Sequence, residues 1–120
     1  MIEVVLRREF IAAAIRAYPT RIRLYVRNVG VFKLSDGRYF HSAVKGQADV
    51  WGYFKGKDGI TRPIEIELKR IRHTVDEAQE MWKAHCEEWR ITYLMLVERK
   101  DDTDTVARFV KELGHAIETE

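Results

Sequence analysis

The chain has 120 residues, of which 46% are hydrophobic and 33% charged, and a formal net charge of +2. These values are typical of one globular domain that buries its own core. The longest apolar runs, at 11–15 and 93–97, are far too short to span a bilayer. Charges interrupt the first ten residues and argue against a signal peptide, and the single cysteine, Cys86, excludes an internal disulfide framework. We therefore expect a cytoplasmic protein.

The charges are distributed unevenly along the chain. Residues 1–72 carry 15 Lys and Arg against 7 Asp and Glu, whereas residues 73–120 carry 6 against 12. Such asymmetry favours a polyanionic partner, unless the two halves fold together and their charges average out.

The first part of the chain predicts one helix followed by strands. Apolar residues at helical spacing run from Glu3 to about Tyr18, and a proline then ends the helix. Residues 21–28 alternate between apolar and mostly basic side chains, as in a strand with one basic face. Residues 31–44 predict a hairpin that turns at 35–37.

A second hairpin is predicted between residues 47 and 69, where two alternating segments flank a glycine-containing turn. Its second strand contains IEIELK, at 64–69, in which three apolar residues alternate with Glu65, Glu67 and Lys69. A period of two is typical of a half-buried strand. The three charges either face solvent, with an ordinary Glu–Lys ion pair, or are gathered for chemistry.

The last part of the chain predicts a helix, a strand and a helix. Thr74 and Glu77 fit a capping box, and the helix behind them runs to about Trp89 with an apolar stripe along one side. Residues 91–98 are apolar on both faces, as expected of a central, fully covered strand. A final amphipathic helix covers about 104–117. We expect one mixed α/β domain of order α-β-β-β-β-β-α-β-α, in which helices cover a mixed sheet.

The register of the second hairpin brings two carboxylates together. If its tip is the three residues 57–59, opposed residues have numbers that add up to 116, and Asp49 lies opposite Glu67. Their Cβ atoms are then roughly 4.5–5.5 Å apart, and the like charges repel each other. A divalent cation removes this conflict, because carboxylates together with phosphate and water are the ligands that Mg²⁺ prefers. Lys69 lies on the same face and would hold a water or a phosphate oxygen beside the metal.

Five short motifs extend this pattern along the chain. They are RN-x-G (Arg27, Asn28, Gly30), GR (Gly37, Arg38), G-x-x-D-x-x-G (Gly46, Asp49, Gly52), E-x-K (Glu67, Lys69) and a glutamine ten residues later (Gln79). In this order, over about residues 27–97, they resemble the virus-type replication-repair nuclease (VRR-Nuc) family of the PD-(D/E)xK superfamily. The resemblance implies a restriction-endonuclease-like core and a nuclease that depends on Mg²⁺ or Mn²⁺.

The resemblance also implies roles for individual residues. Asp49 and Glu67 would ligate the metal, with Lys69 catalytic and Gln79 lining the site. We expect the carbonyl of Leu68 to complete the ligand set.

Two further carboxylates are candidates with open roles. A family glutamate on the first helix would fall on Glu9, whose neighbours one helical turn away are all apolar. Glu65 is an extra carboxylate on the predicted metal face, either facing solvent, which we favour, or acting as a second base. The histidines show no ligand spacing with Cys86, and packing explains His85 and Cys86 better than a zinc site does.

A basic surface accompanies the predicted site. Arg21, Arg23 and Arg27 form one strand face with Tyr25 among them, so this face either contacts phosphates or is simply solvated. The full set of nucleic-acid-binding candidates is Arg21, Arg23, Arg27, Asn28, Arg38 and Lys45.

The small size of the chain is similar to that of phage and bacterial members of the family, which act on branched DNA such as four-way (Holliday) junctions. That resemblance implies a homodimer, since two cuts need two sites related by a two-fold axis. Two other functions stay open: a non-catalytic DNA-binding module on the same fold, and an RNA nuclease or restriction-type enzyme.

Overall fold

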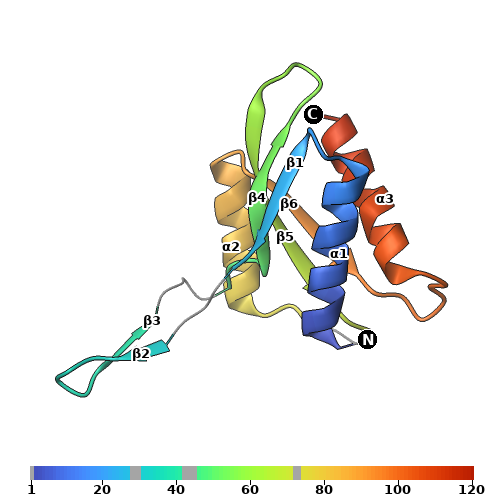
Figure 1. Ribbon diagram of the computed structural model, residues 1–120. Coiled ribbons are helices and arrows are strands. Elements are labelled where there is room, and N and C mark those ends of the chain that lie inside the picture. Colours follow the sequence, from blue (N-terminus) through green and yellow to red (C-terminus); the bar gives the residue numbers. More distant parts are fainter. Residues whose placement is uncertain (1, 28–30, 42–45, 72–73) are drawn as a thin grey trace.

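The computed structural model describes residues 2–27, 31–41, 46–71 and 74–120. The fold is mixed α/β, and its elements follow the expected order (Figure 1). They are α1 (Glu3–Ala17), β1 (Ile22–Val26), β2 (Val31–Lys33), β3 (Tyr39–His41), β4 (Val50–Lys55), β5 (Thr61–Lys69), α2 (Glu77–Glu88), β6 (Thr92–Val97) and α3 (Thr105–Glu118). None of the helices in the described part of the chain is long and apolar enough to cross a membrane.

The main sheet has four strands in the order β1-β4-β5-β6. β4 lies antiparallel to both β1 and β5, and β5 runs parallel to β6. The expectation that every strand joins one sheet is wrong, because β2 and β3 form a separate two-stranded sheet that projects from the body (Figure 1). Residues 33–39 of that hairpin are all exposed, so it has no buried face there to hold it against the main sheet.

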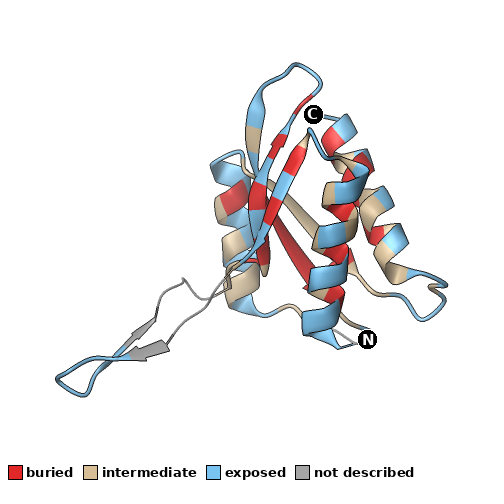
Figure 2. Cartoon of the chain, viewed as in Figure 1, coloured by how far each residue is buried: buried red, intermediate tan, exposed pale blue. Residues whose placement is uncertain are grey.

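The hydrophobic core lies between the main sheet and two helices, α1 and α3 (Figure 2). Helical spacing places Leu6 and Phe10 of α1 on the buried side, where the rings of Phe10 and Phe109 pack edge to face at 6.1 Å. The even-numbered residues of β4 and the central part of β5 point into this core, as do Ile22 and Leu24 of β1. The odd-numbered residues of β5 and β6 face α2, which makes hydrogen bonds to β5 on that side.

Two expectations about burial are wrong. IEIELK was expected to be half-buried, but all five residues from Ile64 to Leu68 are buried. Residues 91–98 were expected to form the central strand, but β6 is at the edge of the sheet and only Leu96 is fully buried in it. The charges of β5 suggest exposure in the sequence, whereas in the structure α2 covers them and each carboxylate has partners: Arg27 and Trp82 for Glu65, and Lys69 and Gln79 for Glu67.

The second helix begins later than the sequence predicted. Its N-cap is Asp76, which forms a capping box with Gln79, so the predicted box of Thr74 and Glu77 is wrong by two residues. The predicted apolar stripe also differs, because Trp89 is 68% exposed whereas Cys86 is fully buried. Gln79, in the first turn of α2, reaches β5, where its Nε2 donates a hydrogen bond to Glu67.

Candidate metal and catalytic site

The predicted hairpin register is confirmed. Every paired position between β4 and β5 fits it, for example Val50 opposite Ile66 and Trp51 opposite Glu65. One step further along, Asp49 comes opposite Glu67, and the backbone N–H of Asp49 donates a hydrogen bond to Glu67 Oε2 (3.2 Å). The two carboxylates therefore lie side by side at one end of the strand pair.

Glu67 is the centre of this cluster. It is only 4% exposed, and its Oε1 lies 3.5 Å from Lys69 Nζ and accepts a hydrogen bond from Gln79 Nε2 (3.3 Å). Burial raises the pKa of Glu67, the negative charge of Asp49 raises it further, and Lys69 opposes both, so that the pKa reaches about 7. A carboxyl with such a pKa gains or loses its proton near neutral pH.

Asp49, like Glu67, is in an environment that raises its pKa. Burial raises its pKa, while the positive charge of Arg7 and a hydrogen bond from the Leu68 backbone N–H act in the opposite direction. The charge of Glu3 and a hydrogen bond with Glu67 also act on this carboxyl. Both acidic groups thus have raised pKa values, which is the effect expected of two carboxylates confined in one partly buried site.

Two motif glycines fix the backbone around this pair. Gly46 has a positive φ of 89°, and a Cβ there would lie 2.2 Å from the carbonyl oxygen of Ala78 at the start of α2. A Cβ on Gly52 would lie 1.9 Å from the carbonyl oxygen of Arg23 on β1. Only glycine permits these approaches, so the glycines on either side of Asp49 bring β4 against both β1 and the N-terminus of α2.

Glu65 is not the solvent-facing residue that we favoured. It is 7% exposed and forms a two-pronged ion pair with Arg27, with Nη1–Oε1 and Nη2–Oε2 distances of 2.5 and 2.8 Å. Its Oε1 also accepts a hydrogen bond from the indole N–H of Trp82 (2.9 Å). The contacts of Glu65 therefore connect β5 with the end of β1 and with α2 next to the site. The guanidinium of Arg27 is paired with Glu65 in this structure.

The possible metal ligands at this site suit a hard cation whose remaining ligands are water and substrate phosphate. Among the described residues no group of three or more His, Cys, Asp or Glu side chains is arranged to hold a metal, so the protein offers two carboxylates and backbone oxygens. That donor set fits Mg²⁺, which keeps water and substrate phosphate in its shell, and does not fit a structural zinc site.

A buried hydroxyl near the pair gives a second test of the fit. Tyr93 OH is buried and has no hydrogen-bond partner in the described part of the structure. Burial raises the pKa of Tyr93 strongly and the charge of Glu67 adds to this, so the hydroxyl stays protonated. An unpartnered buried hydroxyl near two carboxylates is the environment in which an ordered water, or a water bound to a metal, completes the hydrogen bonding.

The structure separates Glu9 from this cluster. Glu9 is exposed on α1, in a shallow surface depression with Arg8 and Arg16. The α1 residues whose charges act on Asp49 are Glu3 and Arg7, which are one helical turn apart on the other side of the helix. The sequence contained this i,i+4 pair of opposite charges, but nothing in it indicated which turn of the helix meets the site.

The predicted basic residues are in several different environments. The Arg21 guanidinium donates to the Lys55 carbonyl oxygen and is ion-paired with Glu118, and Arg38 pairs with Asp36 on the projecting hairpin. Arg23 is exposed, and its Nη1 donates hydrogen bonds to the backbone carbonyls of Pro19 and Ile22. Two further candidates, Asn28 and Lys45, lie outside the described residues.

Cys86 and the histidine beside it have packing roles. Cys86 is fully buried and burial raises its pKa to about 11, so that it remains an unreactive thiol at neutral pH. The ring of His85 stacks on that of Trp82, with centroids 4.7 Å apart.

Comparisons of the chain with protein-family models, with curated proteins and with solved structures found no match.

Proposed function

We propose that this protein is a DNA endonuclease that depends on Mg²⁺ or Mn²⁺ and hydrolyses phosphodiester bonds, and that its four-stranded sheet is a restriction-endonuclease-like core. The observation that supports this is the pair Asp49 and Glu67. They are adjacent and partly or fully buried, and their pKa values are raised. Lys69 and Gln79 both contact Glu67.

Each residue of the cluster has a distinct role in this proposal. Asp49 and Glu67 would hold the cation, which when bound would lower the pKa of a water ligand and neutralise charge on the scissile phosphate. The Leu68 N–H donates to Asp49, and in an extended strand the carbonyl of a residue points to the same side as its N–H. This supports the Leu68 carbonyl as the third protein ligand that we propose.

Lys69 and Gln79 act around the metal ligands. Lys69 is 13% exposed and reaches one oxygen of Glu67, so its ammonium group is positioned to hold the attacking water and to stabilise charge that develops on the phosphate. Gln79 orients Glu67, because its Nε2 donates a hydrogen bond to Oε1 of Glu67. The capping box fixes Gln79 in turn, since its side chain also accepts from the Asp76 backbone N–H.

Branched DNA as substrate and a homodimer as the active form are part of the same proposal and rest on the resemblance to junction-cleaving nucleases. Light scattering tests the assembly. A dimer at micromolar concentration is expected. A monomer of 14.2 kDa that retains activity would exclude paired cutting by two subunits without excluding the nuclease.

Plasmid nicking tests the nuclease itself. Supercoiled plasmid is incubated with wild-type protein in Mg²⁺, in Mn²⁺ and in EDTA, and beside it with Asp49→Asn and Lys111→Met. Lys111 is an exposed residue of α3, one of the two helices on the other face of the sheet, and its variant should cut like wild type. Cutting only with metal, and its loss in Asp49→Asn, is expected. DNA binding without cutting in any metal would favour the non-catalytic module.

A further inference from the structure

Three aromatic side chains form an exposed platform on the main sheet. Tyr25 of β1 lies opposite Trp51 of β4, with ring centroids 5.0 Å apart, and the Tyr25 and Tyr53 rings are 6.4 Å apart. The three residues are 42%, 39% and 43% exposed, respectively. Such cross-strand contacts stabilise a sheet, but ring surface left open to water is not required for that role.

The platform lies beside the proposed catalytic site. Trp51 and Asp49 are two residues apart, so they are on the same face of the sheet and about 7 Å apart along the chain. Helix α2 contacts this face at Glu65 and Glu67 of β5, whereas the aromatic residues of β1 and β4 stay exposed.

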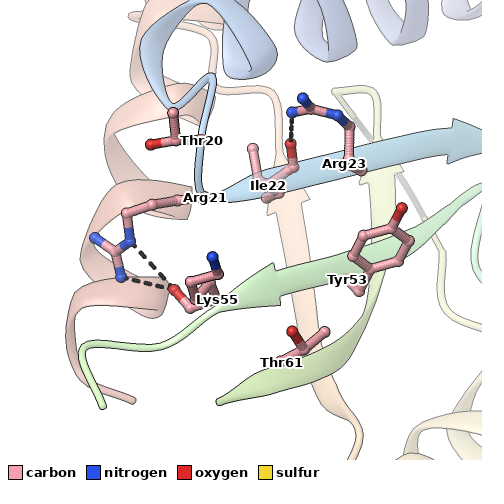
Figure 3. A pocket seen from close by; sticks show the side chains of 7 residues that line it. All are labelled: Thr20, Arg21, Ile22, Arg23, Tyr53, Lys55 and Thr61. Carbon is pink, nitrogen blue, oxygen red and sulfur yellow. Dashed lines mark hydrogen bonds between the residues drawn. The ribbon is translucent and has the colours of Figure 1, made fainter. Parts of the chain in front are cut away.

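Two cationic residues flank the platform on the exposed part of this face, whereas the nearest carboxylate across the strand pair, Glu65 opposite Trp51, is buried. On this face the exposed positions of β1 and β4 are the three aromatic residues together with Arg23 and Lys55. Arg23 and Lys55 also line a surface hollow of about 280 Å³ next to Tyr53 (Figure 3). No described residue accepts a hydrogen bond from Nε or Nη2 of Arg23, so these groups are available to a phosphate.

We propose that this platform binds unpaired nucleotides of the substrate, with bases stacked on Trp51, Tyr25 and Tyr53 and the backbone held by Arg23 and Lys55. Exposed rings beside cations are the combination that single-strand-binding proteins use, and each stacked base contributes substantially because every base has a π-face. Bases inside a duplex are already stacked and offer only their edges. The substrate class is therefore DNA with a single-stranded segment, an inference that rests on the proposed nuclease function.

A second copy of the chain fits this surface less well. A two-fold axis through the platform would bring Arg23 and Lys55 of both copies, four cations, into one interface. The three rings, two-fifths exposed, offer roughly 200–300 Å², well below the about 800 Å² per partner of a stable interface.

Binding in EDTA tests this inference without any cleavage. Labelled single-stranded oligo-dT and oligo-U, and a duplex of the same length, are titrated with wild type, Trp51→Leu, Tyr53→Leu and Trp89→Leu. The first two variants keep an apolar side chain and remove the ring. Trp89 is an exposed tryptophan at the end of α2 and serves as the matched control. Melting curves confirm that each variant is folded.

Wild type and Trp89→Leu should bind single strands equally. Trp51→Leu and Tyr53→Leu should bind them about fivefold to 100-fold more weakly, with little change for duplex. The two oligonucleotides distinguish DNA from RNA as the source of the unpaired bases.

Unchanged single-strand binding in the Leu variants would overturn the inference even if plasmid nicking succeeds. Equal losses for single strand and duplex would overturn it too, as would conversion of a dimer to a monomer by Trp51→Leu. If Trp51→Leu and Tyr53→Leu lose single-strand binding selectively but wild type does not nick plasmid, the platform proposal stands and the nuclease proposal is rejected.

Discussion

The backbone N–H of Asp49 donates a hydrogen bond to the carboxylate of Glu67, so that two acidic side chains from neighbouring strands are held against each other. Like charges placed opposite each other across a strand pair destabilise it. Asp49 and Glu67 are also partly or fully buried, so water screens their repulsion poorly. A proton relieves this conflict when no metal is present, and a divalent cation would relieve it more completely.

The first prediction concerns the pH dependence of stability without metal. Glu67 has a folded-state pKa of about 7, raised from 4.5, so between these values the folded protein holds more protons than the unfolded chain. The free energy of unfolding should therefore fall as pH rises from about 4.5 to about 7, by on the order of 1–3 kcal/mol. Urea melts in EDTA at several pH values measure it.

Glu67→Gln is the matched variant for this measurement, and its stability should fall much less over the same range, because only the raised pKa of Asp49 still contributes. Carboxylates with lowered pKa values, such as Asp58 at about 2, change their contribution only below this window. A wild-type protein that gains stability as pH rises from 5 to 7 would contradict the assignment.

The second prediction concerns Lys69. Replacing it with Met removes the ammonium group near Glu67 and should lower the nicking rate by roughly 10²–10⁴-fold, the range for loss of a positioned proton-transfer or charge-stabilising group. Affinity for DNA should be nearly unchanged, since phosphate contacts come from other Lys and Arg residues. Nicking by Lys69→Met at the wild-type rate would show that Lys69 is not catalytic.

The third prediction concerns the choice of metal. Ca²⁺ accepts more ligands in a looser geometry than Mg²⁺, so it should support DNA binding and position the attacking water poorly. Gel-shift and nicking assays in each metal compare the two steps. Robust cutting in Ca²⁺ alone would count against a site of this kind.

The fourth prediction concerns the contribution of Arg27 to the stability of the fold, compared with that of the exposed Arg38. Arg27→Met leaves the buried carboxylate of Glu65 without its ion-pair partner and should cost about 3–5 kcal/mol of unfolding free energy. Adding Glu65→Leu should restore much of that loss, because the uncompensated charge is gone. Arg38→Met, which removes an exposed pair with Asp36, is the control and should change stability by less than about 0.5 kcal/mol. Thermal or urea melts compare them, and equal effects of the two arginines would refute the structural role of Arg27.

The hairpin register was predictable from the sequence because it depends on local features. Alternation fixes which side chains share a face, and a glycine-containing turn fixes how the two strands meet, so these two features alone pair Asp49 with Glu67. The end of the first helix and the start of the last helix were predictable for a similar reason. Proline ends α1, and Asp104 caps α3 through a hydrogen bond from the Ala107 backbone N–H.

The environment of Glu65 was not predictable, because three distant segments create it. Arg27 and Trp82 come from the end of β1 and from α2, and each was consistent with a simpler role when taken alone. Glu9 shows the same limit. The family resemblance pointed to Glu9 on the first helix, but the α1 residues whose charges act on Asp49 are Arg7 and Glu3. The aromatic platform needed the pairing of β1 with β4, which brings Tyr25 against Trp51.

The measurement that tests the metal site most directly is the melting temperature of wild type and Asp49→Asn, each in EDTA and in excess Mg²⁺ at pH 8, where Glu67 is mostly ionised. In EDTA the variant should be more stable by roughly 0.2–1 kcal/mol, or about 1–6 °C, because one of two opposed charges is gone. Mg²⁺ should raise the melting temperature of wild type and narrow or reverse this order, since only wild type gains binding energy. Glu88→Gln, at an exposed position near the end of α2, should respond to Mg²⁺ as wild type does. If Asp49→Asn is less stable than wild type in EDTA and Mg²⁺ shifts neither protein, then Asp49 and Glu67 do not share a metal ion.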